Sequence, residues 1–246
     1  MRALVVVALT VVVGCACGCK RSELDSLPSN WKKLPLSPLA GSSYLQQAET
    51  SPCAWNVRAD GDRIIIQRVS VRSPQRPDKL QVQFAGGTLV GENRGEWGGS
   101  LYLLEDSNRT PREILSENIL QMFSMHDGVK VITGDLESNK GSAWLYSNAE
   151  GHGWVIQKKV DLRGYPKVIG ESGERILFAY GDAVSIMENF NERQIATLPM
   201  LEVFPNSIAQ DAKGDVYVGM NAFVVRLVSG RNGIAQQWFT QRECLQ

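Results

Sequence analysis

Short apolar segments alternate with short polar segments from residue 54 to the end of the chain. Runs rich in Val, Ile, Leu, Tyr and Phe are separated by Gly, Asp and Asn. Short apolar runs bounded by such turn residues are typical of β-strands. Residues 110–123 have some amphipathic spacing, but the segment is too short to predict a helix. The pattern predicts an all-β domain over residues 48–246.

One motif recurs along this domain: a turn containing Gly, an apolar strand, and a second Gly. It occupies residues 85–91, 126–134, 171–181 and 212–219. The steps between the turn glycines are 41, 45 and 41 residues, counted over Gly87, Gly128, Gly173 and Gly214. Such a period indicates a repeat architecture.

Each repeat contains further apolar runs on both sides of the motif. One run precedes the turn, at residues 80–84 and 207–211. Two runs follow it, at residues 100–106 and 112–115, 142–148 and 154–160, 183–189 and 193–198, and 222–230 and 234–239. Four strands in about 40–45 residues match the blade of a β-propeller.

A four-stranded unit leaves both faces of its sheet exposed, and stacking against neighbouring units buries them. The sequence therefore predicts a β-propeller-like fold of five four-stranded blades. Residues 54–72, joined to the extreme C-terminus, are expected to form the fifth blade and close the ring. The alternatives are a β-sandwich and an open β array.

Residues 206–227 resemble the repeats of NHL, YVTN and gluconolactonase-type propellers, whereas the Gly-His and Trp-Asp signature of WD40 repeats is absent. In gluconolactonase-type propellers, Glu, Asn and Asp hold a divalent metal, and one ligand Asn follows Pro, as Asn206 follows Pro205 here. The matching Pro-Asp-Gly segment is missing. The resemblance implies a lactonase-like metal hydrolase as an alternative function, but our expectation is no metal and no cofactor.

The first residues of the chain are typical of an export signal. Arg2 precedes an apolar run over residues 3–14, which is too short to span a membrane comfortably and fits a secretory signal peptide. Residues 12–15, Val-Val-Gly-Cys, resemble the lipobox of bacterial lipoproteins. The resemblance implies cleavage after residue 14, acylation of Cys15 with fatty acids such as palmitate, and anchoring in the membrane. Ala16 after the anchor resembles an outer-membrane address, with the domain facing the periplasm.

Cys17 and Cys19 follow closely, which leaves other interpretations of this segment open. Either could be the lipidated residue, because each also follows a small residue. A metal site would need wider ligand spacing and a fourth ligand, and a disulfide would close a very small strained loop. Residues 15–47 are interpreted as the lipidated Cys and a flexible tether. Trp31 is an unusual residue for such a segment, and it is expected to be loosely packed, with docking on the domain or at the membrane surface as alternatives.

The two remaining cysteines, Cys53 and Cys244, flank the predicted domain. An exported domain can oxidise them, because the periplasm favours disulfides. We expect a Cys53–Cys244 disulfide that holds the ring of blades closed; the alternative is two free thiols near the termini.

Composition and motifs argue against several function classes. Lys+Arg and Asp+Glu are both 26, so the net charge is zero, which disfavours a nucleic-acid binder. The two histidines, His126 and His152, lie in turn-like contexts rather than beside a nucleophile. The sequence contains no serine-hydrolase elbow, zincin motif or P-loop. No catalytic residues are predicted, and an enzyme is disfavoured.

Binding is better supported than catalysis. In propellers, the loops between strands two and three share a face with the loops between blades. Here they include residues 91–99 and 134–142, and Trp97 offers a large rigid contact surface; its alternative role is to cover a neighbouring blade. The predicted binding face comprises Arg94, Glu96, Trp97, Asn118, Arg163, Tyr165 and Asn206. These features favour an envelope lipoprotein that binds a protein or cell-wall ligand, with an immunity or inhibitor lipoprotein as a further alternative.

Overall fold

The computed structural model describes residues 30–35, 51–70, 78–105, 108–149, 153–198, 205–230 and 233–245. The predicted signal peptide, with Cys15, Cys17 and Cys19 after it, lies outside the described residues, as does His152. None of the described residues belong to a helix long and apolar enough to cross a bilayer.

Two sheets of four consecutive antiparallel strands form one half of the molecule. The first contains β4 (Lys79–Phe84), β5 (Gly87–Glu92), β6 (Leu101–Glu105) and β7 (Asn108–Leu115). The second contains β8 (Ile119–Met125), β9 (Gly128–Asp135), β10 (Lys140–Ala149) and β11 (Gly153–Asp161). The segment with weak helical spacing, residues 110–123, therefore forms β7 and β8.

The other half repeats the same arrangement. The third sheet contains β12 (Val168–Ser172), β13 (Arg175–Ala179), β14 (Ala183–Glu188) and β15 (Asn191–Thr197). The fourth contains β16 (Pro205–Gln210), β17 (Val216–Met220), β18 (Val224–Gly230) and β19 (Gly233–Gln241), with β1 (Trp31–Leu34) added beside β19. A separate hairpin contains β2 (Ala54–Asp60) and β3 (Arg63–Val69).

The predicted repeat unit is confirmed, and the fold is all-β and propeller-like. The turn glycines have the backbone conformation that their position requires: φ is 139° at Gly87, 142° at Gly128, 59° at Gly173 and 88° at Gly214. Glycine reaches positive φ at little steric cost. A side chain at Gly128 would also collide with the carbonyl oxygen of Tyr146 on β10.

Each interface between neighbouring sheets contains its own apolar cluster. Leu89 and Leu101 meet Ile119 and Val131 between the first and second sheets. Phe123 and Ile132 meet Phe178 and Tyr180 between the second and third. The largest cluster joins the third sheet, the fourth sheet and the β2–β3 hairpin, with Trp55, Tyr217 and Trp238 at its centre. Stacking therefore buries the faces that a single sheet leaves exposed.

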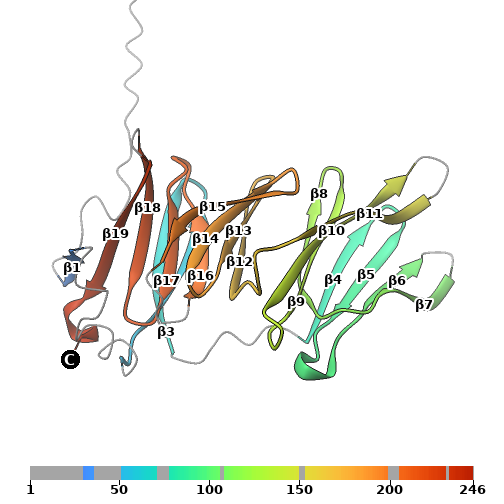
Figure 1. The fold of residues 1–246 in the computed structure, drawn as a ribbon, viewed down its shortest axis with the longest axis horizontal. Helices are drawn as coiled ribbons and strands as arrows, with labels where there is room; N and C mark the ends of the chain where they lie inside the picture. The colour runs from blue at the N-terminus through green and yellow to red at the C-terminus, as the bar shows by residue number, and fades with distance from the viewer. Residues whose placement is uncertain are drawn as a thin grey trace, which may run out of the picture.

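The sheets follow one another in a row, with β4–β7 at one end and β19 and β1 at the other (Figure 1). The prediction of five four-stranded blades was wrong for the described residues, which form three four-stranded sheets, one five-stranded sheet that includes β1, and a two-stranded hairpin. The extreme C-terminus does not add a strand to the hairpin, because residues 242–244 form the short 3-10 helix η4 (Arg242–Cys244). Instead, β2 packs across β16 and β17.

The Cys53–Cys244 disulfide is present. It links the start of β2 to η4, and both cysteines are fully buried. Ser51 strengthens the same junction by donating a hydrogen bond from its hydroxyl to the carbonyl oxygen of Cys244 at 2.9 Å. The disulfide therefore fastens the hairpin to the last sheet at one end of the row, rather than joining the two ends of a ring.

The predicted tether contains an ordered strand. Within residues 15–47, β1 pairs antiparallel with β19, from Trp31 opposite Gln241 to Leu34 opposite Trp238. The ring of Trp31 lies 4.8 Å from that of Trp55, centroid to centroid, and Leu34 is buried. Trp31 thus docks on the domain, which was one of the alternative interpretations of this residue.

Candidate functional site

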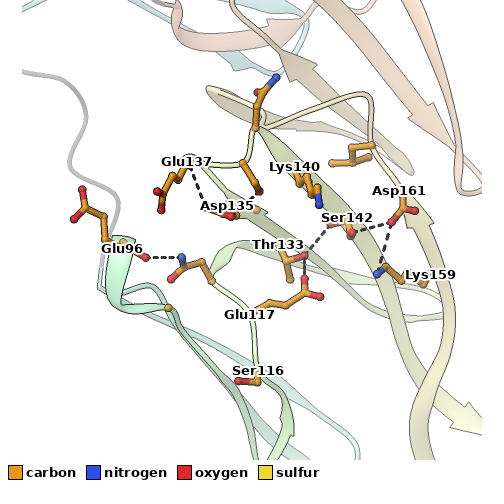
Figure 2. Close-up of a pocket in the computed structure, with 18 of the residues that line it drawn as sticks. Glu96, Ser116, Glu117, Thr133, Asp135, Glu137, Lys140, Ser142, Lys159 and Asp161 are labelled. Carbon is orange, nitrogen blue, oxygen red and sulfur yellow. Dashed lines mark hydrogen bonds and ion pairs between the residues drawn. The ribbon is translucent and has the colours of Figure 1, made fainter.

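A polar groove lies where the loops of the first and second sheets meet, and its volume is about 830 Å³. Its walls come from two connections between strands two and three, β5–β6 and β9–β10, and from two connections between sheets, β7–β8 and β11–β12. Figure 2 shows charged and hydroxyl side chains from these segments facing one cavity. The predicted sharing of one face by these two kinds of loop is therefore present here.

One wall of the groove is the 3-10 helix η3 (Gly95–Trp97) in the β5–β6 connection. Asn118, between β7 and β8, holds it: its side-chain oxygen accepts from the Arg94 amide at 3.2 Å, and its side-chain nitrogen donates to the Gly95 carbonyl at 2.7 Å. The side chain of Trp97 projects outward and is 87% exposed. It therefore does not cover a neighbouring blade.

The facing wall is the β9–β10 loop, which Asp135 organises. The Asp135 carboxylate accepts from the Glu137 amide at 3.0 Å and from the Ser138 hydroxyl at 2.6 Å. The Ser138 hydrogen bond is the main reason why the pKa of Asp135 lies below its ordinary value, with the charge of Lys140 adding to the effect. The loop therefore presents a carboxylate that stays ionised in mildly acidic solution.

The floor of the groove is a network of hydrogen bonds across β9, β10 and β11. Thr133 and Ser142 are direct partners in the β9–β10 ladder. The Thr133 hydroxyl donates to Glu117 and accepts from the indole nitrogen of Trp144 at 3.1 Å. The Ser142 hydroxyl donates to Asp161 at 3.1 Å. The hydroxyls of Thr133 and Ser142 thus orient the carboxylates of Glu117 and Asp161.

Arg163, in the β11–β12 connection, closes the far side of the groove. Its guanidinium donates to both carboxylate oxygens of Asp182 at 3.1 Å, and its backbone amide donates to Glu192 at 3.0 Å. Glu192 also accepts from the Tyr180 hydroxyl at 2.7 Å. Burial is the main cause of a raised pKa at Tyr180, and the Glu192 charge adds to it. This side of the groove is therefore anchored to the third sheet.

The structure brings most of the predicted binding face together. Glu96, Asn118 and Arg163 line the groove. Arg94 and Trp97 flank it on the η3 side, and Arg94 forms an ion pair with Glu92 at 3.0 Å. Tyr165 lies behind the β9–β10 loop, where its amide donates to the side chain of Asn139 at 3.2 Å.

Asn206 does not belong to this group. It is the second residue of β16 in the fourth sheet, and its side-chain nitrogen donates to the side-chain oxygen of Asn221 at 3.2 Å. Among the described residues, no three or more His, Cys, Asp or Glu side chains form a group that could hold a metal ion. His126 lies in the β8–β9 turn, as predicted.

Sequence reasoning missed the groove's floor. The missed lining residues are Glu117, Thr133, Lys159 and Asp161, whereas Asp135, Lys140 and Ser142 lie in the loop at residues 134–142, which the sequence analysis placed on this face. The signal was the pair of polar residues Thr133 and Ser142, which lie opposite each other in β9 and β10. A polar side chain that is buried in a strand requires a hydrogen-bonding partner.

No protein-family model matches this sequence, and no match among curated protein sequences is significant. The solved structures that are similar to this chain include two of β-propeller type. The N-terminal domain of Nup159 is 10% identical, with 85% of this chain and 67% of that chain covered, at a TM-score of 0.44. Streptogramin B lyase is 13% identical, with 84% and 72% covered, at a TM-score of 0.38. Neither likeness identifies a ligand for this chain.

Proposed function

We propose that this protein is a non-enzymatic binding module of the bacterial cell envelope, and that it binds an envelope polypeptide or cell-wall component in the polar groove. The observation that carries the proposal is the groove itself, about 830 Å³ in volume and built from four separate connections. Binding sites concentrate on loops that a rigid scaffold positions, and this volume lies in the range of ligand sites in proteins.

Trp97 supports the same interpretation. A large aromatic side chain that is 87% exposed stabilises the fold very little. Its backbone is nevertheless fixed by Asn118 through two hydrogen bonds to the η3 segment. A rigidly presented tryptophan beside a groove is the kind of residue that dominates binding energies at interfaces.

The lipid anchor belongs to the proposal. The lipobox at residues 12–15 supports cleavage before Cys15 and acylation of its thiol, and Ala16 supports an outer-membrane location facing the periplasm. Anchoring would hold the groove close to cell-wall and outer-membrane components. It would raise their effective concentration at the groove without any further contact.

Photo-crosslinking tests the binding role. A photoreactive phenylalanine analogue replaces Trp97 in the full-length exported protein, and a matched variant carries it at Asp62 in the β2–β3 turn. We expect an ultraviolet-dependent adduct with an envelope component from position 97 and none from position 62. The absence of any adduct specific to position 97, in cells that export the protein, would contradict the proposal.

Metabolic labelling tests the anchor separately. Cells expressing the full chain are fed an alkynyl fatty acid, and the protein is examined for incorporated label. Wild type, Cys17→Ser and Cys19→Ser should be labelled and should fractionate with the outer membrane. Cys15→Ser should remain unlabelled and keep its signal peptide. Equal labelling of Cys15→Ser and wild type would show that another residue is acylated.

A further inference from the structure

We propose that the groove recognises a Lys or Arg side chain of an extended polypeptide, with the Glu117 carboxylate as the counter-ion of that cation. The inference rests on the proposed binding function and names the chemical class of the ligand.

The lining of the groove carries an excess of negative charge. Its acidic residues are Glu96, Glu117, Asp135, Glu137 and Asp161, and its basic residues are Lys140, Lys159 and Arg163. Two of the three cations are already compensated: Arg163 pairs with Asp182, which is not part of the lining, and Lys159 lies 3.7 Å from Asp161. The four remaining carboxylates face one remaining ammonium, that of Lys140. Such a surface attracts cations and disfavours anions.

The acidic side chains come from both walls and the floor of the groove. Figure 2 shows Glu96 on the η3 wall, with Asp135 and Glu137 on the opposite loop and Glu117 beneath them. Asp135 is fixed by its own loop, and its lowered pKa keeps it ionised. The acidic part of the groove is therefore concentrated between η3 and the β9–β10 loop, on the side where Trp97 is exposed.

Among the four carboxylates that no lining cation pairs with, Glu117 is the one that a buried hydroxyl orients. Thr133 is fully buried, and its hydroxyl accepts from the Trp144 indole at 3.1 Å, which directs its proton toward Glu117. This hydrogen bond occupies Oε2. A carboxylate can accept several hydrogen bonds over its two oxygens, so Glu117 retains capacity for a cationic donor. A positioned carboxylate gives up less conformational entropy on binding than a mobile one.

Lys159 shows that an ammonium group suits this groove. Its Nζ lies 4.7 Å from the centre of the Trp144 ring and 3.7 Å from Asp161. The combination of an aromatic face and a carboxylate is favourable for a cation. Trp97 and the carboxylate of Glu96, one residue before it, offer the same two kinds of group on the exposed side.

A polypeptide fits the groove better than a small free cation. Amide and hydroxyl groups of Asn118, Asn139, Ser116 and Ser138 are distributed along the lining. Side-chain amides and hydroxyls both donate and accept, which suits the alternating N–H and C=O groups of an extended chain. The cavity of about 830 Å³ is also far larger than one ammonium group requires.

Fluorescence anisotropy tests the inference on the purified chain. The probe is fluorescein-labelled hexalysine; the competitors are unlabelled hexalysine, the same hexamer with acetylated side chains, hexaglutamate, and spermine. We expect hexalysine to compete at least about tenfold better than each of the other three, since each lacks either the positive charge or the peptide backbone. Equal competition by the acetylated hexamer would overturn the cationic ligand class, and equal competition by spermine would overturn the polypeptide.

Two charge-matched variants locate the contact. Glu117→Gln should weaken hexalysine binding about tenfold, and Asp62→Asn, which removes the same charge in the β2–β3 turn, should leave it within about twofold of wild type. Equal affinities of the two variants would overturn the role of Glu117. If position 97 crosslinks to an envelope component while hexalysine does not bind, this inference fails and the proposed function stands. If hexalysine binds and no adduct forms in cells, the preference for a cationic polypeptide stands and the proposed envelope ligand fails.

Discussion

The guanidinium of Arg163 donates one hydrogen bond to each carboxylate oxygen of Asp182, both at 3.1 Å. This fork joins the connection between the second and third sheets to the β13–β14 loop. Because two parallel hydrogen bonds fix the plane of the guanidinium, Arg163 is held toward the third sheet. Its charge is compensated from outside the groove, and this contributes to the negative character of the lining.

Removing the fork should change stability slightly and binding measurably. The Arg163 and Asp182 side chains are 33% and 46% exposed, so Asp182→Asn should lower the free energy of unfolding by only about 0.5–1 kcal/mol. The uncompensated Arg163 should also weaken hexalysine binding about two- to threefold. Urea denaturation and anisotropy measure the two effects, and Arg163→Gln/Asp182→Asn should restore the affinity. Unchanged affinity in Asp182→Asn would show that Arg163 does not influence the groove.

The Cys53–Cys244 disulfide should contribute substantially to stability. It joins residues 191 positions apart, and a chain-entropy estimate for such a loop is about 5 kcal/mol, although typical values are about 2–4 kcal/mol. Cys53→Ala/Cys244→Ala should therefore unfold at a lower urea concentration than wild type. Reduction of the wild type should shift its midpoint in the same direction. Identical midpoints for wild type and the double variant would contradict a stabilising role.

The repeat could be read from the sequence because its signals are local. Turn glycines, apolar strands and their spacing all lie within about 45 residues, so the predicted run at 142–148 corresponds to β10, and that at 222–230 to β18. The contacts at the ends of the domain could not be predicted in this way. β1 pairs with β19 near the opposite end of the chain, and β2 packs on β16, about 150 positions away, so neither contact leaves a local pattern.

The groove was partly predictable for the same reason. The loop residues Glu96, Trp97 and Asn118 were found because propeller-type repeats place these connections on one face. Glu117 and Thr133 were missed because their roles arise from a hydrogen bond between the β7–β8 connection and β9, which no local pattern encodes. Asn206 was expected near the same face, but it lies in β16 of the fourth sheet and donates to Asn221.

The turn glycine of the second sheet should be far less tolerant of substitution than a glycine in an open turn. Gly128 and Gly233 both have positive φ, 142° and 111°, so alanine is strained at either position. A Cβ at Gly128 would also collide with backbone of β10, whereas nothing lies within 4 Å of one at Gly233. Gly128→Ala should therefore destabilise the protein by at least about 2 kcal/mol more than Gly233→Ala. Equal urea midpoints of the two variants would show that β10 moves aside for the Cβ without a loss of stability.

Alkaline stability should depend on Tyr180. Burial, reinforced by the Glu192 charge, raises the pKa of Tyr180, whereas an unfolded tyrosine ionises near pH 10. Above about pH 10 the folded state therefore binds one more proton than the unfolded state, and stability falls by up to about 1.4 kcal/mol per pH unit from this group.

Tyr180→Phe loses the 2.7 Å hydrogen bond to Glu192 and should be about 1–2 kcal/mol less stable at pH 7. It cannot ionise, so its unfolding free energy should decline less steeply than that of wild type between pH 9.5 and pH 11, a range set by the ordinary tyrosine pKa of about 10. Parallel declines in urea titrations over that range would show that Tyr180 ionises equally in both states.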